Sequence, residues 1–349
     1  MLRRLAIPVL GMALSLSAHA DIVIGSYESG EIRVFADEAN GDVAPIRIIA
    51  GAATGLGSAA GGAFDSGEGV LYVADFWGQA IRVFPAYGSG NLAPLRVLDS
   101  PQLGQMRTVA LAPAHDELIT TNSGCCLAIY NIGASGSVGA LRKWAWRGGQ
   151  GSLTELDYPG GFDYASARDE IVVSDSDPGP AYTPKILVFD RDTGTSYYTG
   201  APKRVIKGAQ TGMGSWVGGV AVDDTNDRIY AASMTNNPDN TRTGRVLVFA
   251  ADAAGDAAPL RVIEGAATQL SGGSGTLPMG VAIDPVRSRL IVSLTDYNDP
   301  ANSALLVFAL DASGNAAPLQ VIRGAQTGLV SLALPIWMPA DAIFDNGFD

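Results

Sequence analysis

The sequence predicts an all-β fold: a six-bladed β-propeller of four-stranded antiparallel blades, with the ring closed by both ends of the chain. Two observations predict it. A short apolar segment that ends in an aromatic residue recurs six times, and no stretch shows the sustained 3.6-residue periodicity of a helix. The six aromatic residues are Phe35, Phe84, Tyr130, Phe189, Phe249 and Phe308, spaced 46 to 60 residues apart. Four short strands repeated at such intervals are typical of propeller blades.

Each period contains four strand-like segments, named a to d here in chain order. The second period shows them clearly, with "GGAFD" at 61–65, "VLYVAD" at 70–75, "AIRVF" at 80–84 and "APLRVL" at 93–98. All are rich in Val, Ile, Leu, Tyr or Phe and are bounded by turn-forming residues. One blade alone would expose its apolar faces, and stacking against two neighbours buries them.

The two ends of the chain complete one blade. "DIVIGSY" at 21–27 is typical of a segment b that lacks a segment a, and "LVSLALPI" at 329–336 is typical of a segment a without a blade. We therefore expect residues 22–27 and about 329–335 to lie in the same blade, so that the ring has no open edge. A seven-bladed ring is the alternative, because periods 3 to 6 are widely spaced.

The first twenty residues have the pattern of a signal peptide. Arg3 and Arg4 precede an apolar stretch at 5–16, and Ala18 and Ala20 supply the small residues of a cleavage site. The predicted organisation is a signal peptide at 1–20, a single propeller domain at 21–335 and a C-terminal tail at 336–349. Cleavage after Ala20 would place the protein in the periplasm or outside the cell.

The remaining chain has no other apolar run of membrane length, and its charge is negative. The full sequence carries 23 basic and 35 acidic residues, a formal net charge of −12. Such a balance repels phosphate backbones, so we expect neither a nucleic-acid partner nor a membrane span.

The segment "VLYVADFWGQAIRVF" at 70–84 resembles the NHL repeat, in which a strand ending "LYVAD" leads through a polar loop into a second strand. The tail resembles short endings found on exported bacterial proteins. The resemblance implies an exported bacterial six-bladed propeller. It does not imply one activity, because NHL-like propellers include enzymes, sugar-binding modules and scaffolds.

Two sets of charged residues recur once per blade, which favours structural roles. The aspartates end segment a, where a side chain accepts turn N–H groups: Asp65, Asp163, Asp223 and Asp284. The arginines lie in the outermost segment d, where we expect them on the solvent side, blocking edge-to-edge pairing: Arg47, Arg96, Arg142, Arg204 and Arg261.

Catalytic motifs are missing from the sequence. After signal cleavage His115 is the only histidine, which excludes Ser-His-Asp and Cys-His arrangements and a multi-histidine zinc site. We predict no catalytic residues and no cofactor. Ca²⁺ or another divalent metal stays open, since Asp and Asn oxygens are suitable ligands, although no EF-hand-like spacing occurs.

The only two cysteines are adjacent, at Cys125 and Cys126, in a chain predicted to be exported. An oxidising compartment favours a disulfide, so we predict a vicinal bridge between them. Two free thiols and an intermolecular bridge are the alternatives.

Loop lengths point to one end of the ring as the binding face. The b–c loops lengthen in periods 4 to 6, and insertions on one face of a repeat protein commonly mark where it binds. The candidate ligand-binding residues are Trp77, Cys125, Cys126, Asp175, Asp177, Tyr182, Trp216, Asn236, Asn237, Asp239, Asp296, Tyr297 and Asp299. Variable solvated loops without a ligand are the alternative.

Together these features favour an exported, non-enzymatic, monomeric propeller that binds a protein, small-molecule or carbohydrate ligand through its long-loop face. The alternative is a metal-dependent hydrolase or lactonase that uses acidic residues in the central funnel. A scaffold of the cell envelope is a third interpretation.

Overall fold

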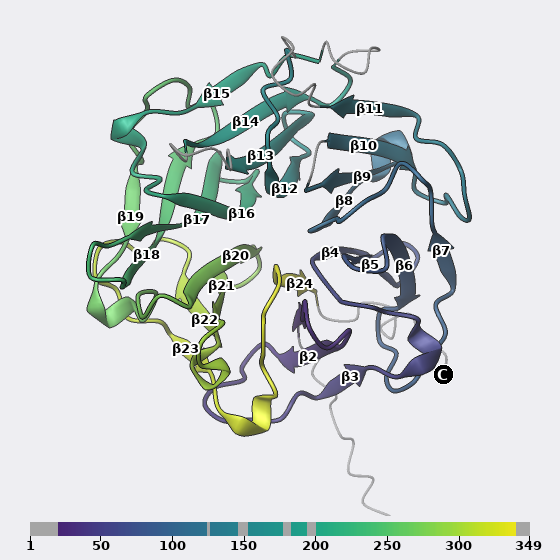
Figure 1. Cartoon of the computed structure of the whole chain (residues 1–349), viewed down its shortest axis with the longest axis horizontal. Helices are drawn as coiled ribbons and strands as arrows, with labels where there is room; N and C mark the ends of the chain where they lie inside the picture. Colours follow the sequence, from purple (N-terminus) through teal and green to yellow (C-terminus); the bar gives the residue numbers. More distant parts are fainter. Residues whose placement is uncertain (1–19, 124–125, 146–152, 177–182, 194–199, 340–349) are drawn as a thin grey trace, which may run out of the picture.

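The computed structural model describes residues 20–123, 126–145, 153–176, 183–193 and 200–339. They form six four-stranded antiparallel sheets arranged as blades around a central axis (Figure 1). The only helices in this part of the chain are 3-10 turns of three residues each. The predicted six-bladed β-propeller is confirmed, with six blades rather than seven.

The strands are given from the axis outward. The first two blades hold β24 (Ile336–Met338), β1 (Asp21–Gly25), β2 (Ile32–Ala36) and β3 (Arg47–Ile49), then β4 (Gly62–Asp65), β5 (Val70–Asp75), β6 (Ala80–Pro85) and β7 (Arg96–Leu98). The next two hold β8 (Val109–Ala112), β9 (Glu117–Asn122), β10 (Cys126–Asn131) and β11 (Arg142–Ala145), then β12 (Pro159–Ala165), β13 (Glu170–Ser176), β14 (Pro184–Asp190) and β15 (Arg204–Ile206). The last two hold β16 (Trp216–Asp223), β17 (Arg228–Asn236), β18 (Arg242–Ala250) and β19 (Arg261–Ile263), then β20 (Thr276–Asp284), β21 (Arg289–Asp296), β22 (Ala304–Ala309) and β23 (Gln320–Ile322).

The ring closes through both ends of the chain, as predicted. β24 pairs antiparallel with β1, with Asp21 opposite Met338 and Val23 opposite Ile336. Figure 1 shows this yellow C-terminal strand beside the purple N-terminal blade. The closing strand starts at Ile336, directly after the expected segment 329–335 and inside the range predicted as the C-terminal tail. Residues 329–335 lead to it, with a single bridge from Leu332 to Ser26.

The core lies between the blades, as the stacking argument requires. An apolar cluster occupies each of the six contacts between neighbouring blades. The recurring aromatic residues belong to these clusters, and each is at most 1% exposed. They explain the repeat, because every blade needs one large side chain at the same depth to fill its contact with the next blade.

Four of the five arginines of the outer strands link neighbouring blades, so the expectation that they lie on the solvent side was wrong for Arg47, Arg142, Arg204 and Arg261. Arg204 binds Glu170 of its own blade at 2.7 Å and donates to the carbonyl of Ala251 in the next blade at 2.7 Å. Arg47 repeats this with Asp21 and Ala86, and Arg142 with Glu117 and Arg191. A guanidinium has several donors, so it can serve both blades at once.

A second link between blades uses a phrase that recurs along the chain, for example "DAAPLRVIEGAAT" at 256–268. The "GAxT" tetrads form the 3-10 turns η1 (Ala52–Thr54), η3 (Ala209–Thr211), η4 (Ala266–Thr268) and η6 (Ala325–Thr327). Each turn donates a backbone N–H to an Asn or Asp at the start of the phrase in the next blade: Asn91, Asp256, Asn315 and Asp42, at 2.6 to 2.7 Å. The other 3-10 turns, η2 (Pro113–His115) and η5 (Pro300–Asn302), lie outside this pattern.

Three of the four recurring aspartates form turns, as expected. Asp65, Asp223 and Asp284 each accept N–H groups from residues two and three positions further on. The expectation for Asp163 was wrong. Ala165, not Asp163, holds the position equivalent to Asp65, because it pairs with the first residue of the following strand. In the part of the chain that is described, no helix has the length and apolar character needed to cross a membrane.

Candidate functional site

The b–c loops and the d–a connections lie at one end of the ring, here called the long-loop face. The a–b and c–d turns lie at the other end, the turn face. The division follows from antiparallel pairing, because strand b ends where strand a of its blade begins. Most of the predicted ligand-binding residues belong to loops at the long-loop face, and their surroundings differ sharply.

Asp175 holds the backbone together. It is fully buried near the end of β13 and accepts the N–H groups of Asp157 and Tyr158, which lead into strand β12. Burial raises the pKa of Asp175 to about 6, although Lys185 nearby and the two N–H donors oppose the shift. Asp75 has the same position in the second blade and accepts from Gly57 and Ser58.

The acidic and amide residues of the longer loops also bind their own backbone. Asp239 accepts from the backbone and hydroxyl of Thr241, and Asn237 donates to Thr241 and Thr243. Asp296 accepts from the N–H groups of Asn298 and Asp299. In turn, Asp299 caps η5 and Asn236 ends β17. These residues shape the loops.

Two of the predicted aromatic residues are exposed at the surface, where a ligand could reach them. Trp77 is 60% exposed and Tyr297 is 48% exposed, while the ring of Trp216 lies against the backbone at Gly218. Cys126 is buried and disulfide-bonded. Cys125, Asp177 and Tyr182 lie outside the described residues, so the vicinal bridge and these two ligand contacts stay predictions.

An arginine surrounded by aromatic rings lies at the long-loop face. The guanidinium carbon of Arg107 is 5.9 Å from the ring centre of Tyr27, 5.7 Å from that of Phe76 and 5.6 Å from that of Tyr158. Its terminal nitrogens approach the hydroxyls of Tyr27 and Tyr158 at 3.5 and 3.4 Å. Cations are attracted to ring faces at this range. We call these four residues the arginine cluster.

The cluster joins blades on opposite sides of the ring. Tyr27 follows strand β1 in the first blade, and Tyr158 precedes β12 in the fourth. Arg107 enters the third blade, so a contact with both tyrosines spans the centre of the face. Trp77 extends the cluster, because its ring packs edge-on against Phe76 at 4.9 Å and its indole N–H donates to the Tyr27 carbonyl.

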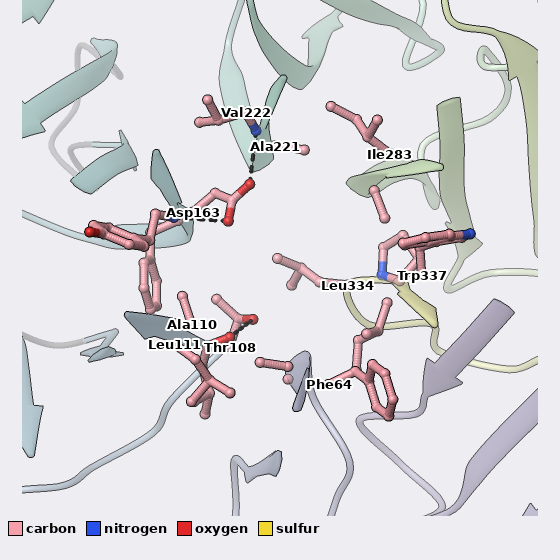
Figure 2. A pocket seen from close by; sticks show the side chains of 18 of the residues that line it. Phe64, Thr108, Ala110, Leu111, Asp163, Ala221, Val222, Ile283, Leu334 and Trp337 are labelled. Atoms are coloured by element: carbon pink, nitrogen blue, oxygen red, sulfur yellow. Dashed lines mark hydrogen bonds between the residues drawn. The ribbon is translucent and has the colours of Figure 1, made fainter. Parts of the chain in front are cut away.

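A central cavity of about 380 Å³ occupies the other half of the channel. All six innermost strands line it, and turn residues Ser66 and Pro113 place its mouth at the turn face. Leu334 packs on the axis against the backbones of Gly161, Gly219 and Gly280, where an added Cβ would lie 2.7 to 2.9 Å from the leucine side chain. Figure 2 shows Leu334 projecting toward the middle of the cavity.

Asp163 places a carboxylate on the wall of this cavity (Figure 2). The equivalent position is Ala63, Ala110, Ala221 or Ala282 in four other blades. Asp163 accepts the N–H groups of Tyr164 and of Val222 in the next blade, both at 2.8 Å. Desolvation raises the pKa of Asp163 to about 6 against these two bonds, and Asp224 adds to the rise. The carboxyl is therefore easier to protonate than an ordinary aspartic acid.

Metal binding in the cavity lacks a visible set of ligands. No group of three or more His, Cys, Asp or Glu side chains gathers anywhere in the described ranges. Both oxygens of Asp163 already accept backbone bonds, and its neighbours on the inner wall are mainly alanine, valine, leucine and isoleucine. Chemically the cavity combines aliphatic side chains with polar backbone and hydroxyl groups, and it carries Asp163 on its wall and Asp65 at its mouth.

No protein-family model matches the chain, and no curated protein sequence matches it. The class that the structure defines is thus architectural: a six-bladed β-propeller with an arginine cluster at one end of its channel and a cavity that contains the Asp163 carboxylate at the other.

Sequence reasoning missed Arg107, Tyr27, Phe76 and Tyr158. It weighted the longest b–c loops, whereas Tyr27 and Phe76 lie in short b–c loops and Arg107 and Tyr158 lie in d–a connections. Their common signal is position, because each lies one or two residues after a strand b or before a strand a. Those positions surround the axis in any propeller, whatever the loop length.

Proposed function

We propose that the protein is an exported, non-enzymatic, NHL-like propeller that binds a ligand or protein partner at the centre of its long-loop face. The observation that supports this most is the arginine cluster, in which side chains from four different blades converge on one point. Trp77 and Tyr297 add exposed aromatic surface at the same face. Exposed aromatic rings and arginine are the residue types most enriched at binding sites.

The competing function is metal-dependent hydrolysis in the channel. Such an enzyme needs several oxygen or nitrogen ligands around an open metal position. The cavity supplies Asp163 as the one carboxylate on its inner wall, with the turn-forming Asp65 at its mouth. A binding role needs no such set, so we favour it.

The decisive experiment compares two variants by thermal shift and tryptophan fluorescence against a panel of glycans, peptides and small acids. In the first, Trp77→Ala and Tyr297→Ala are combined on the long-loop face. In the control, Val286→Ala changes a residue that is 74% exposed on the turn face. We expect ligand binding by the wild type to be lost in the double variant and kept in the control and after EDTA treatment.

Turnover of a lactone or ester that EDTA abolishes and Ca²⁺ or Zn²⁺ restores would establish the hydrolase instead. Export is checked separately by intact mass of the secreted protein. We expect the chain to start at Asp21, because the cleavage pattern ends at Ala20.

A further inference from the structure

Arg107 differs in its partners from the half-buried arginines that form ion pairs. Arg82 pairs with the buried carboxylate of Asp75 at 2.9 Å, and Arg204 with Glu170 at 2.7 Å. Arg107 forms no ion pair with a carboxylate of the described residues, and its pKa is influenced by Tyr27 and Tyr158 rather than by an acid. A guanidinium carries five N–H donors, and two contacts of 3.4 and 3.5 Å leave most of them available.

An unpaired cation in a half-buried position favours an anion. Removing a charge from water is costly, and the three aromatic rings compensate only in part, since a cation–π contact is weaker than a charge-assisted hydrogen bond to an anion. A planar carboxylate matches the planar guanidinium, because both of its oxygens can accept parallel bonds. The protein therefore offers a charge that a bound carboxylate would complete.

The tyrosines supply further donors at the same point. Burial raises the pKa of Tyr27, outweighing the opposite influence of Arg107, so its hydroxyl keeps its proton at neutral pH. The hydroxyls of Tyr27 and Tyr158 lie beside opposite terminal nitrogens of Arg107 and can turn toward a bound oxygen. Burial likewise raises the pKa of Tyr297, and the positive charge of Arg107 partly offsets this rise.

We propose that Arg107, Tyr27 and Tyr158 bind a carboxylate group of the ligand, and that Trp77 and Tyr297 contact the apolar or aromatic part next to it. This inference rests on the proposed binding function and names the chemistry of the ligand. The chain's net charge of −12 and the nearby Glu28 repel polyanions, which favours a single carboxylate over a phosphate ester. The carboxylate comes from a small organic acid or from the C-terminus of a peptide.

Matched probes distinguish the contribution of the ligand's carboxylate from that of its aromatic ring. Benzoate and benzamide differ in the carboxylate, and a peptide ending in phenylalanine is compared with its C-terminal amide. Binding is followed by tryptophan fluorescence and isothermal titration at low salt. We expect the two carboxylates to bind at least about 10-fold more tightly than the two amides, since charge-assisted bonds are about twice as strong as neutral ones. Preference for benzoate or for the peptide identifies the source.

Variants assign the interaction to the cluster. Arg107→Gln should lower benzoate affinity about 10-fold or more, Arg107→Lys should lower it less, and Tyr158→Phe should lower it about 3-fold through loss of one donor. Ala63→Ser in the cavity is the matched control. Circular dichroism and the melting temperature verify folding, and Tyr158→Phe keeps the test valid if Arg107→Gln unfolds.

Two results would overturn the inference. The first is equal affinity for carboxylates and amides, and the second is unchanged benzoate binding in both Arg107→Lys and Tyr158→Phe. If Trp77→Ala with Tyr297→Ala still abolished binding of another ligand, the proposed function would stand while the carboxylate assignment failed.

Discussion

Single side chains fasten neighbouring blades at the "GAxT" turns. Asn315 shows the arrangement: its Oδ1 accepts the N–H of Ala267 at 2.7 Å, in the turn of the preceding blade. Gly265 opens that turn with a φ of 133°, and a Cβ there would lie 2.4 Å from Asn315 Oδ1. The glycine and the amide therefore depend on each other, although 50 residues separate them in the sequence.

Replacing Asn315 by alanine should lower the free energy of unfolding by about 1 kcal/mol, the usual cost of losing a capping side chain. Ser313→Ala, an exposed change in the same turn, is the control. Urea denaturation followed by fluorescence measures both. Equal stability of the Asn315 variant and the wild type would show that water replaces the bond at no cost.

Asp163 makes stability depend on pH. Its pKa is about 6 in the folded protein, above the 3.8 of an ordinary aspartic acid. The folded state binds this proton more tightly, so the stabilisation is complete below about pH 4 and is lost as the pH rises through 6. Relative to Asp163→Asn, the wild type should lose at most about 3 kcal/mol over this interval.

The measurement is urea denaturation of both proteins between pH 4 and 8. The difference between them should fall up to about pH 6 and stay level above pH 7. Because the two proteins share every other titrating group, their difference isolates Asp163. A difference that is constant across the series would contradict the raised pKa.

At the scale of strands, the three-residue strand β24 completes the first blade. It supplies the innermost strand of the first blade, and Ile336 and Met338 are at most 9% exposed. Without it, β1 would present an unpaired edge to the channel. The chain end therefore holds the ring closed.

A chain that stops after Pro335 should lose about 3–6 kcal/mol, from two apolar side chains worth about 1.5–3 kcal/mol each. The control stops after Pro339 and keeps β24. Thermal unfolding should show a lower midpoint for the shorter chain alone. Matching midpoints for the two truncated chains would mean that β24 does not stabilise the first blade.

The strands could be predicted from the sequence because each is a short apolar segment bounded by turn-forming residues. Which partner each side chain binds was harder to predict from the sequence. The strand-d arginines lie at equivalent positions in five of the six repeats, yet only the structure brings Arg204 against the carbonyl of Ala251 in the next blade. The expectation for Asp163 was wrong for a related reason. The segment "GGFD" resembles "GGAFD", but strand β12 continues for two residues beyond Asp163 before its turn.

At the scale of the whole molecule, the ring joins two ends of opposite character. The long-loop face carries an exposed aromatic surface around Arg107, which has no carboxylate partner among the described residues, and the turn face leads into a cavity with Asp163 on its wall and Asp65 at its mouth. Leu334 separates them. The site could not be found from repeats, because convergence over the axis depends on ring closure and brings together residues as distant as Tyr27 and Tyr158.

The ring architecture also predicts that the chain ends can be moved to another blade without loss of the fold. Asp21 and Met338 pair directly, so a four-residue turn made of Pro339, two added residues and Ala20 would join them as residues 66–69 join β4 to β5. A circular permutant with this join and new ends between Gly67 and Glu68 closes the second blade through both termini instead of the first. We expect it to fold with nearly wild-type stability, because all six contacts between blades are kept and the cut lies in an exposed turn. Circular dichroism and urea denaturation measure this. A permutant that aggregates or unfolds several kcal/mol more easily would show that the first blade must be closed last, and that the six blades are not equivalent in folding.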